Sequence, residues 1–296
     1  MSLQFIMGNS GSGKSYCLYD TVVREAIENP DKNYLVIVPE QFTMQTQKDL
    51  CLAHPKGGIM NIDVLSFGRL AYRVFEEVGQ DARVVLDDEG KNLVLRKIAG
   101  ECEKDLKVFK GNLKKQGYIS EVKSVLSEFA QYGVDFERLD DFMKEVPPES
   151  YLHYKLDDIR TIYEKFEEYL SEKYITKEEM LDVLSDAVPY SDILKGSVVA
   201  MDGFTGFTPV QNRLIGELFS VCEKVMITVM MDGRENPYVY EHPYQIFALG
   251  KQMVTSLMKI AGEKKTEIEE PICLFERPVY RFRDCSEMAF LETELF

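Results

Sequence analysis

Eight residues near the amino terminus carry the chemistry of a phosphate-binding loop. The run Gly8-Asn9-Ser10-Gly11-Ser12-Gly13-Lys14-Ser15 fits the pattern G-x-x-x-x-G-K-[ST] and directly follows the apolar run 3–7. In such a loop, glycines let backbone N–H groups turn toward a phosphate, Lys14 supplies positive charge, and the Ser15 hydroxyl is a ligand for Mg²⁺. We therefore predict that residues 8–15 bind ATP with Mg²⁺. The alternative is a Gly/Ser-rich turn before an amphipathic helix.

A carboxylate for the metal side of such a site follows a later apolar run. Residues 198–201 are apolar and end in Asp202, which predicts a buried strand that places this carboxylate near Mg²⁺ bound at Ser15. The next residue is Gly203, so the side chain that commonly activates the attacking water is missing. We expect nucleotide binding without significant hydrolysis by this chain, and we assign no catalytic residue. The alternative is a simple strand-ending turn.

Apolar runs elsewhere predict the sheet that positions these residues. Strands are expected at 34–38, 59–65, 197–201 and 224–230, in addition to the first run. Helical patterns alternate with them, which is typical of a parallel sheet with helices on both faces. The predicted fold class is therefore α/β. The tail also contains two strand-like runs, 272–275 and 279–282.

A long helical stretch interrupts the strands. About 110 residues between the third and fourth strands show no strand signal, and the apolar positions of 118–129 and 156–170 recur at the helical period. Pro147-Pro148 separates these two patterns. A short coiled coil is the alternative to an inserted subdomain. The predicted domains are a RecA-like P-loop domain at 1–85 and 191–262, an inserted helical subdomain at 86–190, and the start of a following domain at 263–296.

Composition limits the classes of protein. The 296 residues are 45% hydrophobic and 29% charged, and no apolar run approaches the length of a membrane span. Without a signal peptide, and with six cysteines that form no C-x-x-C pair, a reduced cytoplasmic protein with no membrane partner is expected. The net charge of −15 argues against a general coat of nucleic-acid contacts but allows a locally basic channel.

The segment 202–211 resembles the D-E-F-Q-D-T-x-x-x-Q motif of UvrD-like superfamily 1 helicases. Three positions are retained and three positions that matter for catalysis differ: Asp202, Phe204 and Gln211 are kept, whereas Gly203, Thr205 and Gly206 replace Glu, Gln and Asp. Residues 66–72 resemble the T-F-H-S-F-A segment after the third strand of those helicases. The inserted helices match the position of their first accessory domain.

An intact phosphate loop with a decayed acidic motif resembles the AddB (RexB) subunit of bacterial AddAB helicase-nucleases. Residues 38–43 and 289–296 look like that family as well, and the resemblance spans essentially the whole chain. It implies a degenerate RecA-like helicase region of an ATP-dependent helicase/exodeoxyribonuclease that acts in DNA double-strand break repair by end resection. It also implies an AddA-type helicase-nuclease partner subunit, and an iron-sulfur cluster only in carboxyl-terminal regions that this sequence lacks.

The same resemblance implies that single-stranded DNA passes over the carboxyl ends of the strands and that this region helps to recognise the Chi recombination signal. Side chains following three strands combine charge, amides and rings suited to DNA. The expected DNA-binding residues are Gln41, Thr43, Phe67, Arg69, Tyr72 and Phe207. The alternative is that Phe67 and Tyr72 are core residues under the helix and that Arg69 belongs to a surface ion pair. For the function of the chain as a whole, the alternatives to an AddB-type subunit are a small-molecule kinase and a structural subunit with a vestigial P-loop.

Overall fold

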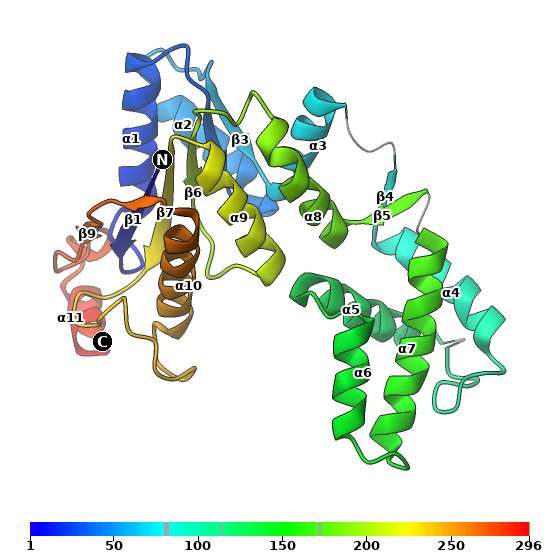
Figure 1. Ribbon diagram of the computed structural model, residues 1–296. Coiled ribbons are helices and arrows are strands. Elements are labelled where there is room, and N and C mark those ends of the chain that lie inside the picture. The colour runs from blue at the N-terminus through cyan, green and yellow to red at the C-terminus, as the bar shows by residue number, and fades with distance from the viewer. Residues whose placement is uncertain (80–82, 114, 171–172, 296) are drawn as a thin grey trace. The chain divides into compact units, whose positions relative to one another are not determined.

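The computed structural model describes residues 1–79, 83–113, 115–170 and 173–295 (Figure 1). The chain divides into two compact units. Unit 1 comprises residues 1–79, 184–207 and 211–296, and unit 2 comprises 80–183 and 208–210. Unit 1 contains a mostly parallel sheet flanked by helices, so the predicted RecA-like α/β fold is confirmed.

The described part of unit 1 is built on a seven-stranded sheet in the order β3-β2-β6-β7-β1-β8, with β9 also paired with β1. All of these pairs are parallel. The strands are β1 (Ser2–Gly8), β2 (Tyr34–Ile37), β3 (Ile62–Leu65), β6 (Val198–Met201), β7 (Lys224–Met230), β8 (Glu267–Ile268) and β9 (Ile272–Leu274). The apolar runs at 34–38, 59–65, 197–201 and 224–230 thus each contain the strand that they predict.

Helices cover both faces of this sheet, which explains why its strands are apolar on both sides. On one face, α1 (Lys14–Glu28) and α2 (Thr43–Ala53) share a core with alternate strand residues such as Val36 and Ala200. Figure 1 shows α9 (Pro209–Val221) and α10 (Ala248–Lys264) on the other face. The helix α3 (Phe67–Val78) follows β3.

The tail differs from its predicted assignment. The sequence predicts that residues 263–296 begin a following domain, but β8 and β9 pair with β1 and so belong to the sheet of unit 1. This pairing provides partners for the backbone N–H and C=O groups on the edge of β1 that faces away from β7. The strand-like run 272–275 contains β9, whereas 279–282 contains the 3₁₀ turn η3 (Tyr280–Phe282) instead of a strand. The helix α11 (Ser286–Leu295) follows, and Phe296 lies outside the described residues.

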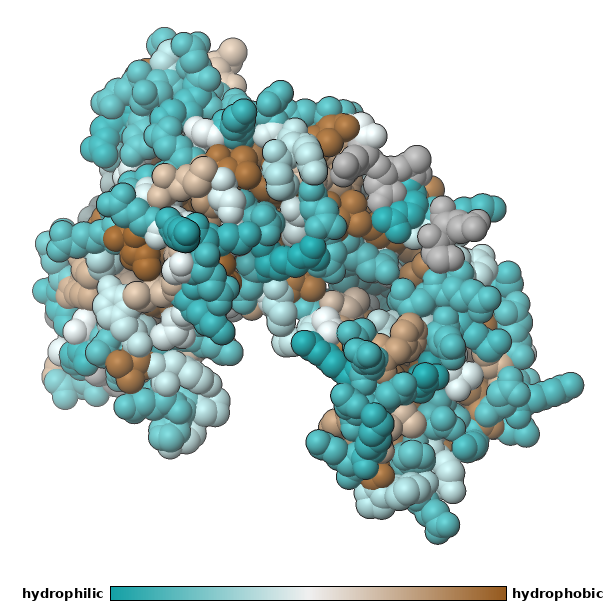
Figure 2. Space-filling view, viewed as in Figure 1, coloured by the Kyte–Doolittle hydropathy of each residue, from teal (hydrophilic) through white to brown (hydrophobic). Residues whose placement is uncertain are grey.

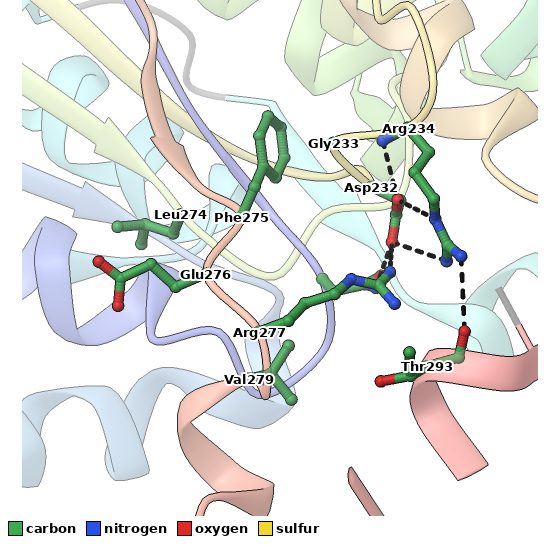
Figure 3. A pocket seen from close by; sticks show the side chains of 10 residues that line it. Asp232, Gly233, Arg234, Leu274, Phe275, Glu276, Arg277, Val279 and Thr293 are labelled. Atoms are coloured by element: carbon green, nitrogen blue, oxygen red, sulfur yellow. Dashed lines mark hydrogen bonds and ion pairs between the residues drawn. The ribbon is translucent and has the colours of Figure 1, made fainter. Parts of the chain in front are cut away.

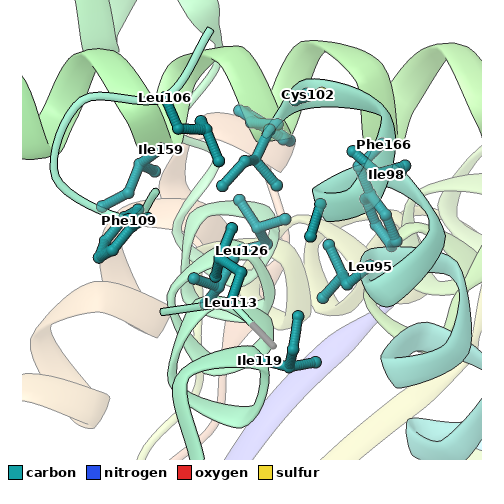
Figure 4. Packing of buried hydrophobic residues seen from close by; sticks show 14 of the residues in the cluster. Leu95, Ile98, Cys102, Leu106, Phe109, Leu113, Ile119, Leu126, Ile159 and Phe166 are labelled. Atoms are coloured by element: carbon teal, nitrogen blue, oxygen red, sulfur yellow. The ribbon is translucent and has the colours of Figure 1, made fainter. Parts of the chain in front are cut away.

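Unit 2 is mainly helical. Its helices are α4 (Asp88–Cys102), α5 (Gln116–Tyr132), α6 (Phe136–Glu145) and α7 (Tyr151–Leu170), and α8 (Lys177–Ala187) begins in it. The helices α4 to α7 enclose a hydrophobic cluster that includes Leu95, Leu126 and Phe166 (Figure 4). The expectation of no strand here was wrong, because β4 (Val84–Leu86) and β5 (Tyr174–Thr176) form a parallel pair. Strands of three residues are too short to show a period in sequence.

A buried carboxylate organises one loop of unit 2. Asp158 on α7 is 1% exposed and accepts hydrogen bonds from the backbone N–H groups of Lys107, Val108 and Phe109 at 2.7–2.8 Å. These donors would otherwise be unsatisfied where the loop enters the core. The neighbouring Asp157 pairs through its carboxylate with the exposed ammonium of Lys107, at 2.9 Å.

No helix among the described residues is both long and apolar enough to cross a bilayer. The face in Figure 2 is mostly hydrophilic, with hydrophobic side chains in small separate groups.

We predict that Asp158→Ala lowers the free energy of unfolding of unit 2 by about 3 kcal/mol, because it leaves three backbone donors without their acceptor. Asp157→Ala is the matched control and should cost less than about 1 kcal/mol, since it removes an exposed ion pair. Urea denaturation followed by circular dichroism compares the two variants. Equal losses of stability would contradict the role given to Asp158.

Candidate functional site

The predicted phosphate loop connects the end of β1 to the start of α1. Gly8 ends the strand, and Gly13 occupies the N-cap position of α1 with φ of 96°. This left-handed conformation favours glycine, and no heavy atom would lie within 4 Å of a Cβ at that position. The first-turn N–H groups of α1, which have no acceptor within the helix, are the donors that a bound anion would use.

Lys14 is folded back over the loop. Its ammonium donates to the carbonyl oxygens of Gly8 at 2.9 Å and Asn9 at 2.8 Å. Burial lowers the pKa of Lys14 from 10.5 to about 8, the charge of Asp202 opposes this shift, and the charge of Arg281 adds to it. The structure therefore brings Lys14 within electrostatic range of both a carboxylate and a second cation.

Asp202 follows β6 and is 8% exposed. Its Oδ2 accepts from the Tyr19 hydroxyl at 2.8 Å, and its Oδ1 accepts from the Thr228 hydroxyl at 2.6 Å. Since β7 lies between β6 and β1, Thr228 on β7 reaches Asp202 from the strand next to the loop-bearing one. Sequence reasoning found Asp202 but missed both hydroxyl partners.

Gly203 has a backbone conformation that suits glycine. Its φ is 79°, and a Cβ there would lie 3.6 Å from Pro39 and 3.8 Å from Phe42. A side chain in this left-handed conformation would be strained. The position that carries a glutamate in the resembling helicases is therefore adapted here to a residue without a side chain.

The tail of the chain lies directly on the loop. The backbone N–H of Arg281 donates to the Gly11 carbonyl at 3.1 Å, and a Cβ on Gly11 would lie only 2.7 Å from Arg281 Cβ. The amide of Asn9, 9% exposed, donates to Asp232 at 2.9 Å and to Glu292 on α11 at 3.0 Å. The side chain of Asn9 thus points away from solvent and anchors the loop to the tail.

Asp232, two residues after the end of β7, is the centre of this anchor. Figure 3 shows its carboxylate between the guanidinium groups of Arg234 and Arg277, beside a pocket of about 470 Å³. Burial raises the pKa of Asp232, but hydrogen bonds from Arg234 and the charge of Arg277 outweigh burial and lower it below its usual value. Arg277 also lies 3.7 Å from Glu292. The charged network holds the tail, α11 and the loop together.

The expected DNA-binding residues divide by exposure. Gln41, Arg69 and Tyr72 are exposed, and Phe207 is partly buried. Thr43 is buried and donates its hydroxyl to the Glu40 carbonyl at 3.0 Å, so this hydroxyl closes a turn.

The rings of this rim contact one another. Phe67 is 8% exposed, and its ring centroid lies 5.4 Å from that of Phe204 and 6.4 Å from that of Phe207. Pro39 and Phe42 lie near Gly203, so segments that follow β2, β3 and β6 come together at one edge of the sheet. The sequence suggested that Phe67 is an exposed ring for stacking. The ring is instead buried against Phe204 and Phe207, so Phe67 supports this edge and does not present a free stacking surface.

Arg281 is a residue near the loop that sequence reasoning did not assign. The sequence indicates only a strand-like segment there, and nothing in the residue pattern shows that it returns to a loop 270 positions earlier. Glu292 and Asp232 were missed for the same reason. Pairing of β9 with β1 brings the tail residues Arg281 and Glu292 to the loop, and pairing of β7 with β1 brings Asp232. Such pairing has no local signature in sequence.

The residues present suit a nucleotide with Mg²⁺. The loop has glycines at its tight positions, Lys14 supplies charge, and Ser15 presents an exposed hydroxyl at the helix start. The hydroxyl oxygen of Ser12 is buried without a hydrogen-bond partner in the described structure. A loop with an unused polar atom and a cation held by its own carbonyls is suited to rearrange around a phosphate.

The fold and the loop define a RecA-like α/β protein with a P-loop motif. The chain belongs to the family described as "ADDB, N-terminal", which it matches over residues 5–292, and this confirms the resemblance drawn from the sequence.

Similar proteins share one name. The chain is 43% identical over its full length to the B component of the ATP-dependent helicase/deoxyribonuclease of Lachnoclostridium phytofermentans, covering 26% of that protein. It is 34% identical to the Clostridium tetani protein of the same name, covering 26% of it, and 36% identical to that of Thermoanaerobacter sp., covering 25%. In both cases the match covers the whole chain. The chain thus spans about a quarter of the length of these relatives.

We predict that Asn9→Ala loosens α11, because the substitution removes both hydrogen bonds that the Asn9 side-chain amide donates to Asp232 and Glu292. Hydrogen exchange of backbone amides in residues 286–295 should become faster. Ser10→Ala, at the exposed neighbouring position, is the control and should leave that exchange unchanged. Unaltered exchange in Asn9→Ala would show that other contacts hold the helix.

Proposed function

We propose that this chain is the nucleotide-binding, catalytically degenerate amino-terminal part of an AddB-type subunit that acts in DNA double-strand break repair by end resection. The observation that carries the proposal is the combination of an intact loop, with Lys14 near Asp202, and a glycine at position 203. The relatives named as helicase/deoxyribonuclease subunits support the setting. We further propose a cytoplasmic complex with an AddA-type partner subunit.

In this proposal the loop holds the phosphates of ATP. Backbone N–H groups of residues 8–15 surround the phosphate, Lys14 leaves the Gly8 and Asn9 carbonyls to meet it, and Arg281 adds a second positive charge beside the loop. Ser15 and Asp202 are the residues that would hold Mg²⁺, which neutralises phosphate charge when bound.

Hydrolysis needs a base that positions water, and Gly203 supplies none at the expected position. Its left-handed backbone also disfavours the return of a side chain by simple substitution. We therefore propose that bound ATP serves to order the loop and its attached tail. The tie between Asn9, Asp232 and Glu292 gives the physical link between the loop and α11.

We predict that Lys14→Ala weakens the binding of ATP with Mg²⁺ about tenfold or more, which corresponds to about 1.4 kcal/mol. Because the Lys14 pKa is about 8 in the free protein, affinity should be highest below that pH and fall as pH rises through it, when the ammonium loses its proton. Isothermal titration calorimetry at several pH values measures both effects.

The control for this prediction is Lys259→Ala, which changes an exposed lysine on α10. It should retain both the affinity and the pH dependence of the unaltered chain. Equal affinity in Lys14→Ala and the unaltered chain would refute the assignment of the loop.

For DNA, we propose that the edge formed by the ends of β2, β3 and β6 contacts single-stranded DNA and contributes to Chi recognition. Exposed Gln41 offers an amide for base edges, exposed Arg69 a charge, and Tyr72 and Phe207 rings for stacking. Phe67 and Thr43 support this surface from buried positions. An acidic chain with a net charge of −15 should bind DNA weakly by itself and more weakly at higher salt.

We predict that Gln41→Ala, Arg69→Ala and Phe207→Ala each reduce Chi-dependent attenuation of nuclease activity in a reconstituted two-subunit complex. Loss of a base contact or stacking platform should cost about 1–3 kcal/mol of binding. The control is Arg73→Ala, which lies one turn beyond Arg69 on α3 and pairs with Asp63 at 2.9 Å. An unchanged Chi response in all three variants would remove this edge from the recognition surface.

A further inference from the structure

A chain of buried hydroxyl groups runs from the candidate metal carboxylate to α2. The Tyr19 hydroxyl donates to Asp202 Oδ2 at 2.8 Å and lies 3.2 Å from the Thr46 hydroxyl. A carboxylate accepts only, and a tyrosine has one hydroxyl proton, so Thr46 must donate to Tyr19. Tyr19, Thr46 and Asp202 are exposed by 9%, 4% and 8%, respectively.

These bonds fix the orientation of the Asp202 carboxylate. Tyr19 holds one oxygen from α1 and Thr228 holds the other from β7, at 2.6 Å. Both donors are hydroxyl groups, so they orient the carboxylate without pairing it with a cation. Each oxygen has a further lone pair that remains available to water around a metal ion.

Tyr19 also ties this carboxylate to the loop itself. It lies five residues after Lys14 on the same helix, so the helix that begins at the phosphate loop carries the group that aims Asp202. Burial of the phenol and the nearby charge of Asp202 both raise the pKa of Tyr19, which keeps the donating proton in place at ordinary pH.

We propose that Tyr19 is a positioning residue: its hydroxyl, oriented by Thr46, aims Asp202 at the metal of a nucleotide bound in the loop. The inference rests on the proposed nucleotide site and adds a determinant that lies outside both sequence motifs. A phenylalanine would fill the same space in the core, so packing alone gives no reason for the hydroxyl.

The test measures how much Mg²⁺ strengthens nucleotide binding. A fluorescent ATP analogue is titrated with the 296-residue chain, once in Mg²⁺ and once in EDTA, to measure its affinity in each buffer. The readout is the ratio of the affinity in Mg²⁺ to the affinity in EDTA. In Tyr19→Phe this ratio should fall about three- to tenfold, because a hydrogen bond to a charged group is lost, while the affinity in EDTA stays unchanged. A purely structural role would change both affinities or neither.

Tyr16→Phe is the matched control, since Tyr16 lies on the same helix with 76% exposure and should keep the ratio of the unaltered chain. Thr46→Val removes the donor to Tyr19 and should lower the ratio in the same direction. If Thr46, Tyr19 and Asp202 act as one hydrogen-bonded series, the variant with both Tyr19→Phe and Thr46→Val should lower the free-energy gain from Mg²⁺ by less than the sum of the two single effects.

The outcomes separate the two proposals. If the unaltered chain binds no nucleotide, the proposed function fails. If it binds with a clear gain from Mg²⁺, and Tyr19→Phe and Thr46→Val keep the full gain while their melting curves show folded protein, the positioning role is overturned. If Tyr19→Phe does not fold, Thr46→Val decides by the same ratio.

Discussion

Parallel pairing along β1 is the constraint on which the rest of the site depends. The strand is paired on one side with β7 and on the other with β8 and β9, so Gly8 is fixed at the carboxyl edge of the sheet. Pairing with β7 brings Thr228 and Asp232 to the loop. Pairing with β9 brings Arg277 and the following tail. Side chains from distant parts of the chain converge because their strands share this one neighbour.

The consequence is a loop held from several directions. Lys14 is tied to the loop's own carbonyls, and Asn9 is tied to Asp232 and Glu292. The Asp232 carboxylate is buried, so it needs the guanidinium groups of Arg234 and Arg277 as partners, while Arg277 itself stays partly open to water. The same contacts that stabilise the loop therefore connect it to α11, and a change in the loop on binding an anion has a direct route to that helix.

The features that could be predicted from the sequence are those that depend on neighbouring residues. The phosphate loop has a fixed spacing, the buried strands are continuous apolar runs, and Asp202 ends one of them, so each could be predicted from neighbouring residues. The association of the segments after β2, β3 and β6 was also predictable, because parallel strands end at the same edge. The α/β class with a parallel sheet followed from these elements, and the RecA-like helicase architecture was implied by the family resemblance.

What sequence missed depends on pairing between distant residues. Arg281 reaches the loop only because β9 pairs with β1, so the sequence alone predicts a separate domain for the tail. Thr43 and Phe67 were expected at a DNA surface because of their positions in sequence, but their hydroxyl and ring serve a turn and an aromatic cluster. The strands β4 and β5 were not predicted, because three residues are too few to show the alternation of apolar and polar residues that indicates a strand. Tyr19 was assigned no role from the sequence, since the partner of a hydroxyl group cannot be predicted from the residues around it.

The central claim is that the chain binds ATP and leaves it intact, and the identity of the bound nucleotide tests this most directly. The chain is loaded with radiolabelled ATP and Mg²⁺, separated from free nucleotide, incubated, and analysed by chromatography. The account predicts that the retained nucleotide is ATP throughout, because Gly203 supplies no base for hydrolysis. Conversion to ADP by the chain, with loss of that conversion in Lys14→Ala, would contradict it.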